Sequence, residues 1–140
     1  MATKRKTKKR ELLRREGVVS QWEMALFVHA SDGRHRMTRD GRYYLHAKGA
    51  FAEAVGTVTG FDLMLVDGGE GLKEASAIGS VVGAKKEITA VVDLGPEEYA
   101  FASRLAISGC QCHMHMSFDK LHYGSGLIRS LSISTHPLNE

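Results

Sequence analysis

The sequence is poor in cysteine and lacks a long hydrophobic run. Its 140 residues include two cysteines, Cys110 and Cys112, which would share one side of a strand, a poor geometry for bonding to each other. We expect both to be thiols in a reducing cytosol, and therefore a cytoplasmic protein. The longest apolar stretch, residues 55–66, is interrupted by polar residues and is shorter than the roughly 20 residues of a membrane-spanning helix. The N-terminus also lacks the apolar segment of a secretory signal, so no membrane partner is predicted.

Phosphate-loop and disorder signatures are missing as well. The glycine-containing stretches 67–71 and 79–85 lack the Gly-Lys-Ser/Thr ending of a phosphate-binding loop, which favours simple turns. With 43% hydrophobic and 25% charged residues, the composition is that of an ordinary globular domain. A chain of this length is expected to form one domain with its own core.

Charge is unevenly distributed along the chain. The net charge is +3, but residues 1–17 carry eight Lys or Arg against two Glu, which leaves the remainder with 11 basic and 14 acidic residues. We therefore divide the chain into a basic N-terminal arm, residues 1–17, and a single domain, residues 18–140. A basic arm on an acidic body is typical of a protein that attaches to a polyanion such as nucleic acid.

The pattern of apolar residues predicts a single-domain α+β sandwich of antiparallel or mixed sheet, with two or three helices beside the basic N-terminal arm. The clearest helix is 96–108, because proline and two glutamates open it and Gly109 ends it. The Asp40-Gly41 pair predicts a hairpin turn between residues 34–39 and 42–47. A second, short helix is expected at 50–55. The predicted strands are 18–30, 61–66, 80–82, 87–94, 110–120 and 127–134.

The segment 110–119 holds the most distinctive side chains. Strand alternation places Cys110, Cys112, Met114, Met116 and Phe118 on a core face. The other face holds Gln111, His113, His115, Ser117 and Asp119. This polar face is either the wet side of a sheet or a site, and His113 with His115 is an alternative metal-ligand pair. We predict no cofactor and no metal, because a closed zinc site needs a second ligand pair and the other histidines are scattered singly.

A His-x-Ser unit occurs twice, at predicted strand ends. His115 and Ser117 form one unit and His29 and Ser31 the other. If the two units faced each other across a cleft, one imidazole would take a proton from the attacking hydroxyl or water. The other imidazole would protonate the leaving oxygen. The two serine hydroxyls would hold the phosphate oxygens. His46 is a possible substitute for His29, although no hydroxyl follows it two residues later.

These units resemble the two-histidine phosphoesterases, which carry two His-x-Ser/Thr motifs on an α+β sandwich. The resemblance lies mainly in residues 87–120, as a strand, a helix and the strand that bears His115 and Ser117. It implies that His29, Ser31, His115 and Ser117 are catalytic. It also implies cyclic or 2′-linked phosphates of nucleotides or RNA as substrates.

A second cluster combines arginines with tyrosines. Guanidinium groups bind phosphates and tyrosines stack on bases, so this cluster and the arm indicate a surface for single-stranded nucleic acid. A solvated hairpin with inward-packing tyrosines is the competing interpretation. The candidate nucleic-acid-binding residues are Lys4, Arg5, Lys6, Lys8, Lys9, Arg10, Arg34, Arg36, Arg39, Arg42, Tyr43 and Tyr44.

The sequence therefore leaves two classes of function. The favoured hypothesis is a metal-independent phosphoesterase that acts on nucleotide or RNA phosphodiesters by two-histidine general acid/base catalysis. The alternative is a non-enzymatic nucleic-acid-binding or assembly protein, part of a virion or other large complex. Both hypotheses predict a nucleotide or nucleic-acid partner.

Overall fold

The computed structural model describes residues 11–33, 36–68 and 76–138, and it describes only the backbone of 31–33, 36–40 and 42. Seven strands and one helix occur in these ranges. Their order is β1 (Leu12–Gly33), β2 (Arg36–Val55), β3 (Val58–Asp67), β4 (Gly79–Gly83), β5 (Ile88–Leu94), α1 (Pro96–Ser108), β6 (Cys112–Asp119) and β7 (Gly126–Ser134).

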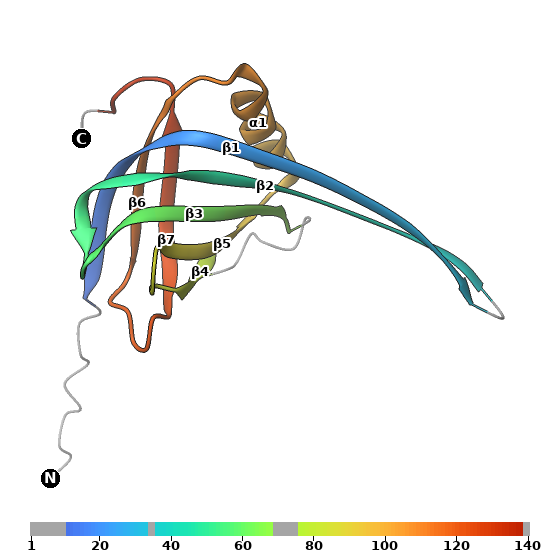
Figure 1. Ribbon diagram of the computed structural model, residues 1–140, viewed down its shortest axis with the longest axis horizontal. Coiled ribbons are helices and arrows are strands. Elements are labelled where there is room, and N and C mark those ends of the chain that lie inside the picture. The colour runs from blue at the N-terminus through green and yellow to red at the C-terminus, as the bar shows by residue number, and fades with distance from the viewer. Residues whose placement is uncertain (1–10, 34–35, 69–75, 139–140) are drawn as a thin grey trace, which may run out of the picture.

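The strands form a closed barrel in the order β1-β2-β3-β5-β4-β7-β6 (Figure 1). Strand β1 closes it, because β1 pairs with β2 on one side and with β6 on the other. β3 and β5 run parallel, whereas the other neighbours are antiparallel. The predicted α+β sandwich with two or three helices is wrong. The sheet closes on itself, and one helix is present in the described part of the chain.

The core fills the barrel and follows the alternation of each strand. Leu63 and Leu65 on β3 and Met114 and Phe118 on β6 are fully buried. Their neighbours in sequence point outward, as the polar face of residues 113–119 predicted. Cys110 differs from the expectation: it is exposed, because β6 begins only at Cys112. Both cysteines are free, and burial raises the pKa of the Cys112 thiol.

Two glycines allow the paired backbones of β1 and β2 to approach each other closely. A Cβ at Gly17 would meet the carbonyl oxygen of Ala50, and one at Gly49 would meet the carbonyl oxygen of Val18 and the ring of Phe61. Phe61 is buried next to Gly49, and its ring packs against that of Phe51, with centroids 4.9 Å apart. The absence of side chains at Gly17 and Gly49 therefore permits the bend of the sheet.

Helix α1 has the bounds that the sequence predicts. The amide of Gly95 donates to Glu98 Oε1 at 2.7 Å, and Gly109 ends the helix in the left-handed region at φ 66°. Ala102 and Leu105 are buried against the barrel. No helix in the described residues has the length and apolar character needed to cross a membrane.

Three local predictions are wrong. Asp40 and Gly41 lie inside β2, opposite His29 and Val28, so the chain does not turn there. The expected helix at 50–55 is instead the end of β2, because burial of Phe51 and pairing with β3 override the helix preference of its alanines. Strand β1 begins at Leu12 rather than Val18, so residues 12–17 of the predicted arm belong to the barrel.

The close approach of the β1 backbone to Gly49 on β2 gives a stability prediction. Gly49→Ala should lower the free energy of unfolding by about 1–3 kcal/mol, because the new methyl group collides with backbone. Gly41→Ala in the same strand is the matched control, since the nearest atom lies 4.0 Å from its Cβ position. Urea unfolding of both variants measures the difference. Equal midpoints would contradict the proposed close contact.

Candidate functional site

Strands β1 and β2 continue well beyond the barrel as a two-stranded ribbon (Figure 1). The pairing of β1 with β6 ends at Val19, and the pairing of β2 with β3 ends at Leu45. From there to Gly33 and Arg36, the two strands pair only with each other. We call residues 20–33 and 36–44 the projecting hairpin. At about 3.3 Å per residue, its longer strand spans roughly 45 Å.

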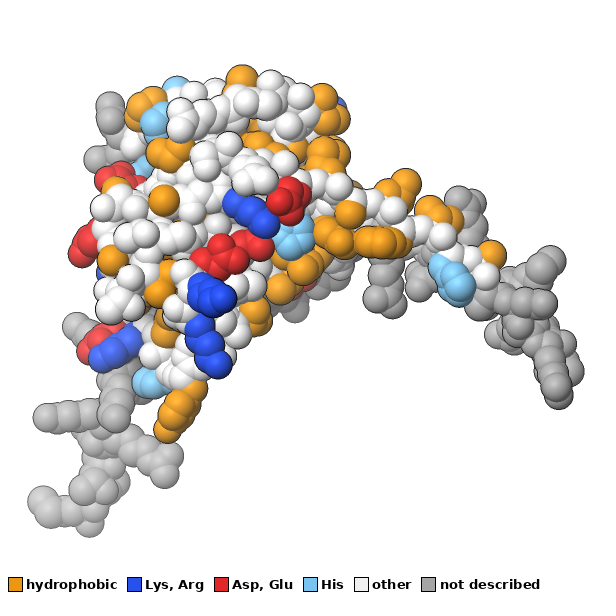
Figure 2. Space-filling model, viewed as in Figure 1, with side chains coloured by type: hydrophobic (Ala, Val, Ile, Leu, Met, Phe, Trp, Pro, Cys, Tyr) orange, Lys and Arg blue, Asp and Glu red, His pale blue; other side chains and the backbone are white. Residues whose placement is uncertain are grey.

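Both faces of the projecting hairpin carry apolar side chains that solvent reaches. On one face Met24, Leu26 and Val28 are 53%, 68% and 52% exposed, and on the other Phe27 is 57% exposed. The first face continues the barrel interior, because its alternation runs on into the fully buried Leu45. Figure 2 shows hydrophobic side chains along the ribbon. An apolar surface of this extent is typical of a protein interface.

Hydrogen bonds and ring contacts fix the root of the hairpin on its inner face. The hydroxyl of Tyr43 donates to Asp67 Oδ2 at 2.9 Å, and its ring meets that of Tyr99 on α1 edge to face, 5.1 Å between centroids. The bond to Asp67 raises the pKa of Tyr43, and burial raises that of Tyr99. These contacts set the direction in which the hairpin leaves the barrel.

A contact of His46 with Asp62 and ion pairs of Lys48 fix the root on its outer face. His46 Nδ1 lies 2.7 Å from Asp62 Oδ1, and Lys48 Nζ lies 3.2 Å from Glu23 Oε1 and 3.9 Å from Asp62 Oδ2. The bond to Glu23 raises the pKa of Lys48, with a further contribution from the charge of Asp62. Farther along this face, the rings of Phe27 and Tyr44 lie 5.9 Å apart.

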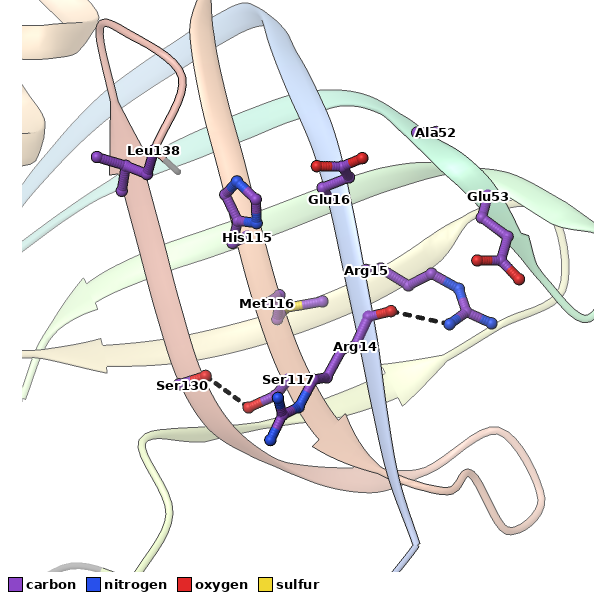
Figure 3. A pocket seen from close by; sticks show the side chains of 10 residues that line it. All are labelled: Arg14, Arg15, Glu16, Ala52, Glu53, His115, Met116, Ser117, Ser130 and Leu138. Atoms are coloured by element: carbon purple, nitrogen blue, oxygen red, sulfur yellow. Dashed lines mark hydrogen bonds between the residues drawn. The ribbon is translucent and has the colours of Figure 1, made fainter. Parts of the chain in front are cut away.

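The histidine-bearing face of β6 lies on the outside of the barrel, far from the hairpin tip. His115 and Ser117 point to the same side of the strand and line an open hollow of about 870 Å³ (Figure 3). Ser117 Oγ is hydrogen-bonded to Ser130 Oγ on β7 at 2.5 Å. Arg14, Glu16 and Glu53 also line the hollow. His115 therefore shares its surroundings with two carboxylates.

The structure does not bring the two His-x-Ser units together. His115 on β6 pairs across the sheet with Glu16 on β1. His29 lies on β1 as well, but 13 residues beyond Glu16, in the projecting hairpin opposite Asp40. That is about 40 Å along β1. The side chain of Ser31 lies outside the described residues. The substitute His46 is bonded to Asp62 and does not line the hollow.

The alternative metal site likewise gains no further ligands. His113 and His115 lie on the outer face of β6. Within the described ranges, no three His, Cys, Asp or Glu side chains are grouped so that they could hold a metal ion.

The predicted nucleic-acid residues fall in different places. The ring of Tyr43 contacts that of Tyr99, and the ring of Tyr44 contacts those of Phe27 and His46 on the outer face of the hairpin. The backbones of Arg36, Arg39 and Arg42 run along β2 in the projecting hairpin, and their side chains lie outside the described residues. Also outside them are Lys4, Arg5, Lys6, Lys8, Lys9, Arg10 and Arg34.

Sequence reasoning missed the exposed apolar residues of the hairpin. It predicted a strand at 18–30, but not that the strand leaves the barrel. A signal is present: over residues 24–30 both alternating sets are largely apolar, with Met24, Leu26 and Val28 on one side and Ala25 and Phe27 on the other. A strand that is apolar on both faces is typical of one covered on both sides.

No protein-family model, curated protein or solved structure matches this chain. The resemblance to two-histidine phosphoesterases therefore stays a prediction.

The anchoring of the hairpin root gives a pH prediction. The Tyr43 proton is held more tightly in the folded protein than the ordinary value of 10.0 implies, so the bond to Asp67 stabilises the fold below that pH and is lost as the pH rises through the raised pKa. Absorbance titration of tyrosinate should show two late-ionising groups, Tyr43 and Tyr99, and one of the two should be lost in Tyr43→Phe. Tyr123→Phe is the control, because Tyr123 is fully exposed. Loss of a late-ionising group in the control instead would contradict the assignment.

Proposed function

We propose that the chain is a non-enzymatic assembly protein whose copies associate through the projecting hairpin. One observation carries the proposal: a ribbon with apolar side chains on both faces extends beyond the barrel from a root fixed by Tyr43, His46 and Lys48. A two-stranded hairpin alone in water is marginally stable. It becomes stable when another surface covers it.

The energetics favour association. Full burial of a Leu, Val, Phe or Met side chain contributes about 1.5–3 kcal/mol, so covering the half that is still exposed contributes roughly 1 kcal/mol for each residue. Met24, Leu26, Phe27 and Val28 all gain in this way. The hairpin also presents two strand edges that β3 and β6 do not cover. Long uncovered edges of this kind favour pairing with another chain.

The same geometry weighs against the phosphoesterase hypothesis. Two-histidine catalysis needs both imidazoles within hydrogen-bond reach of one phosphate. His29 and His115 are separated by about 40 Å of strand, and Ser117 is bonded to Ser130. We therefore favour assembly over catalysis for this chain.

We further propose that the assembly binds nucleic acid through the basic N-terminal arm and works in the cytoplasm. The support is the segregation of charge: residues 1–10, which precede β1, hold six Lys or Arg and no acidic residue, whereas the remainder holds 13 basic and 16 acidic residues. Blocks of basic residues at a terminus are typical of arms that bind nucleic acid, and such an arm on a self-associating body fits a component of a virion or other large nucleic-acid complex.

Association should depend on the hairpin. We expect wild type to sediment above the monomer mass in a concentration-dependent way, and Leu26→Glu/Phe27→Glu to sediment as a monomer, because two buried carboxylates would be unpaired. Val82→Glu is the control, since Val82 is equally exposed but lies on β4 of the barrel. Identical sedimentation of wild type and the hairpin variant would overturn the proposal.

A substrate panel separates assembly from catalysis. We expect wild type to leave 2′,3′-cyclic nucleotides and short RNA intact in EDTA, because the two histidines do not meet. Turnover that is lost in both His115→Ala and His29→Ala would contradict this and restore the two-histidine mechanism. Ser132→Ala, opposite His115 on β7, is the control variant.

Nucleic-acid binding should depend on salt through the arm. Replacing Lys4, Arg5, Lys6, Lys8, Lys9 and Arg10 by Gln should flatten the plot of log affinity for single-stranded DNA against log salt by about 4, at roughly 0.7 per neutralised phosphate. Lys85→Gln/Lys86→Gln removes exposed barrel charges and should change the slope far less. Fluorescence anisotropy measures both. An unchanged slope in the six-fold variant would exclude the arm as the binding element.

A further inference from the structure

The surface that receives the projecting hairpin is the feature that the proposed function leaves open. A second apolar surface lies beside α1, where the helix meets the barrel. It is a groove of about 370 Å³ between α1 and the ends of the strands. Its lining residues are Leu65, Leu94, Glu97, Glu98, Phe101, Ala102, Leu105, Leu131 and Ile133.

We infer that this groove binds the projecting hairpin of a second copy of the chain, head to tail. The inference rests on the proposed function and names the partner surface. Its floor is apolar, and Phe101, at its edge, is 57% exposed. The hairpin face with Met24, Leu26 and Val28 offers exposed apolar side chains at alternate positions of one strand.

Charge favours the same pairing. Residues 31–42 carry four arginines and two aspartates, whereas the other residues from 18 onward carry 7 basic and 12 acidic residues. Glu97 and Glu98 line the groove at the first turn of α1, and both are exposed. The excess of basic residues in this part of the sequence and the carboxylates that line the groove favour association of two copies.

The hairpin does not reach its own groove. Its root is held by the bond from Tyr43 to Asp67 and by the ring contact with Tyr99, and the ribbon points away from the body of the barrel (Figure 1). A hairpin that enters this groove therefore comes from another copy of the chain. Such a contact joins two different surfaces, so repetition closes a ring or extends a filament.

The hairpin is also large enough for a stable contact. A ribbon roughly 45 Å long and 10 Å wide offers about 450 Å² on each face. Both faces together match the roughly 800 Å² that each partner contributes to a standard protein interface.

A mixing experiment tests the head-to-tail contact. Leu26→Glu destroys the hairpin surface and keeps the groove, whereas Phe101→Glu destroys the groove and keeps the hairpin. Each variant alone should associate roughly 100-fold more weakly than wild type, because a carboxylate enters an apolar contact. Mixed, they retain one intact interface between them. Sedimentation velocity should then show a heterodimer that grows no further.

Ile107→Glu is the matched control on the same helix. Ile107 is 75% exposed but does not line the groove, so this variant should assemble like wild type. Thermal unfolding by circular dichroism verifies that each variant is folded, and substitutions at these exposed positions should shift the midpoint little.

The outcomes separate the two proposals. If Leu26→Glu is monomeric while Phe101→Glu still assembles, the hairpin associates but the groove is not its partner, and this inference is overturned. The same holds if the mixture stays monomeric. If Leu26→Glu, tested alone and with Phe27→Glu, assembles like wild type, the proposed function itself fails.

Discussion

The length of the β1–β2 pairing is the constraint on which the rest of the structure depends. β1 has 22 residues and β2 has 20, while the strands that flank them in the barrel, β6 and β3, have 8 and 10. The first part of β1 closes the barrel against β6, and the excess of both strands must leave it. Apolar residues that would be core in a shorter strand are thereby carried into solvent. The hairpin face with Met24, Leu26 and Val28 therefore continues the row of side chains that fills the interior of the barrel.

The rest of the molecule supports this projection. Gly17 and Gly49 let the paired backbones of the two strands approach closely, and the buried ring of Phe61 lies next to Gly49. Farther out, Tyr99 on α1 packs against the ring of Tyr43 at the root. Asp67 at the end of β3 accepts the hydrogen bond of the Tyr43 hydroxyl, so Tyr43 is held from both elements. A fixed root lowers the entropy that the hairpin loses when another surface covers it. This rigidity makes the hairpin a suitable docking element.

Much of the local structure could be predicted from the sequence. Helix 96–108 could be predicted, because a proline, two acidic residues and a terminal glycine mark its two ends within a short stretch of sequence. The two faces of β6 could be as well, because alternation is a local property. Closure of the sheet could not, since it depends on the pairing of residues near 16 with residues near 115, about 100 positions away in the chain.

The candidate site shows the same division. The two His-x-Ser units are real features of the sequence, but strand length decides where they lie, and β1 carries His29 far from His115. Asp40-Gly41 has the composition of a hairpin turn, yet the register of β1 with β2 pairs Asp40 with His29 and Gly41 with Val28 inside the ribbon. The apolar residues 24–28 were visible as strand formers. Their exposure follows from the end of the barrel at Val19, which no local pattern marks.

Hydrogen exchange of the projecting hairpin tests the central claim most directly. Mass spectrometry of peptides from residues 20–33 and 36–44 would compare dilute with concentrated protein, with peptides from β5 as the internal reference. If copies cover the hairpin, exchange in these peptides slows by tenfold or more on concentration, while β5 exchanges at the same rate in both samples. Equal exchange of the hairpin at both concentrations would contradict the account.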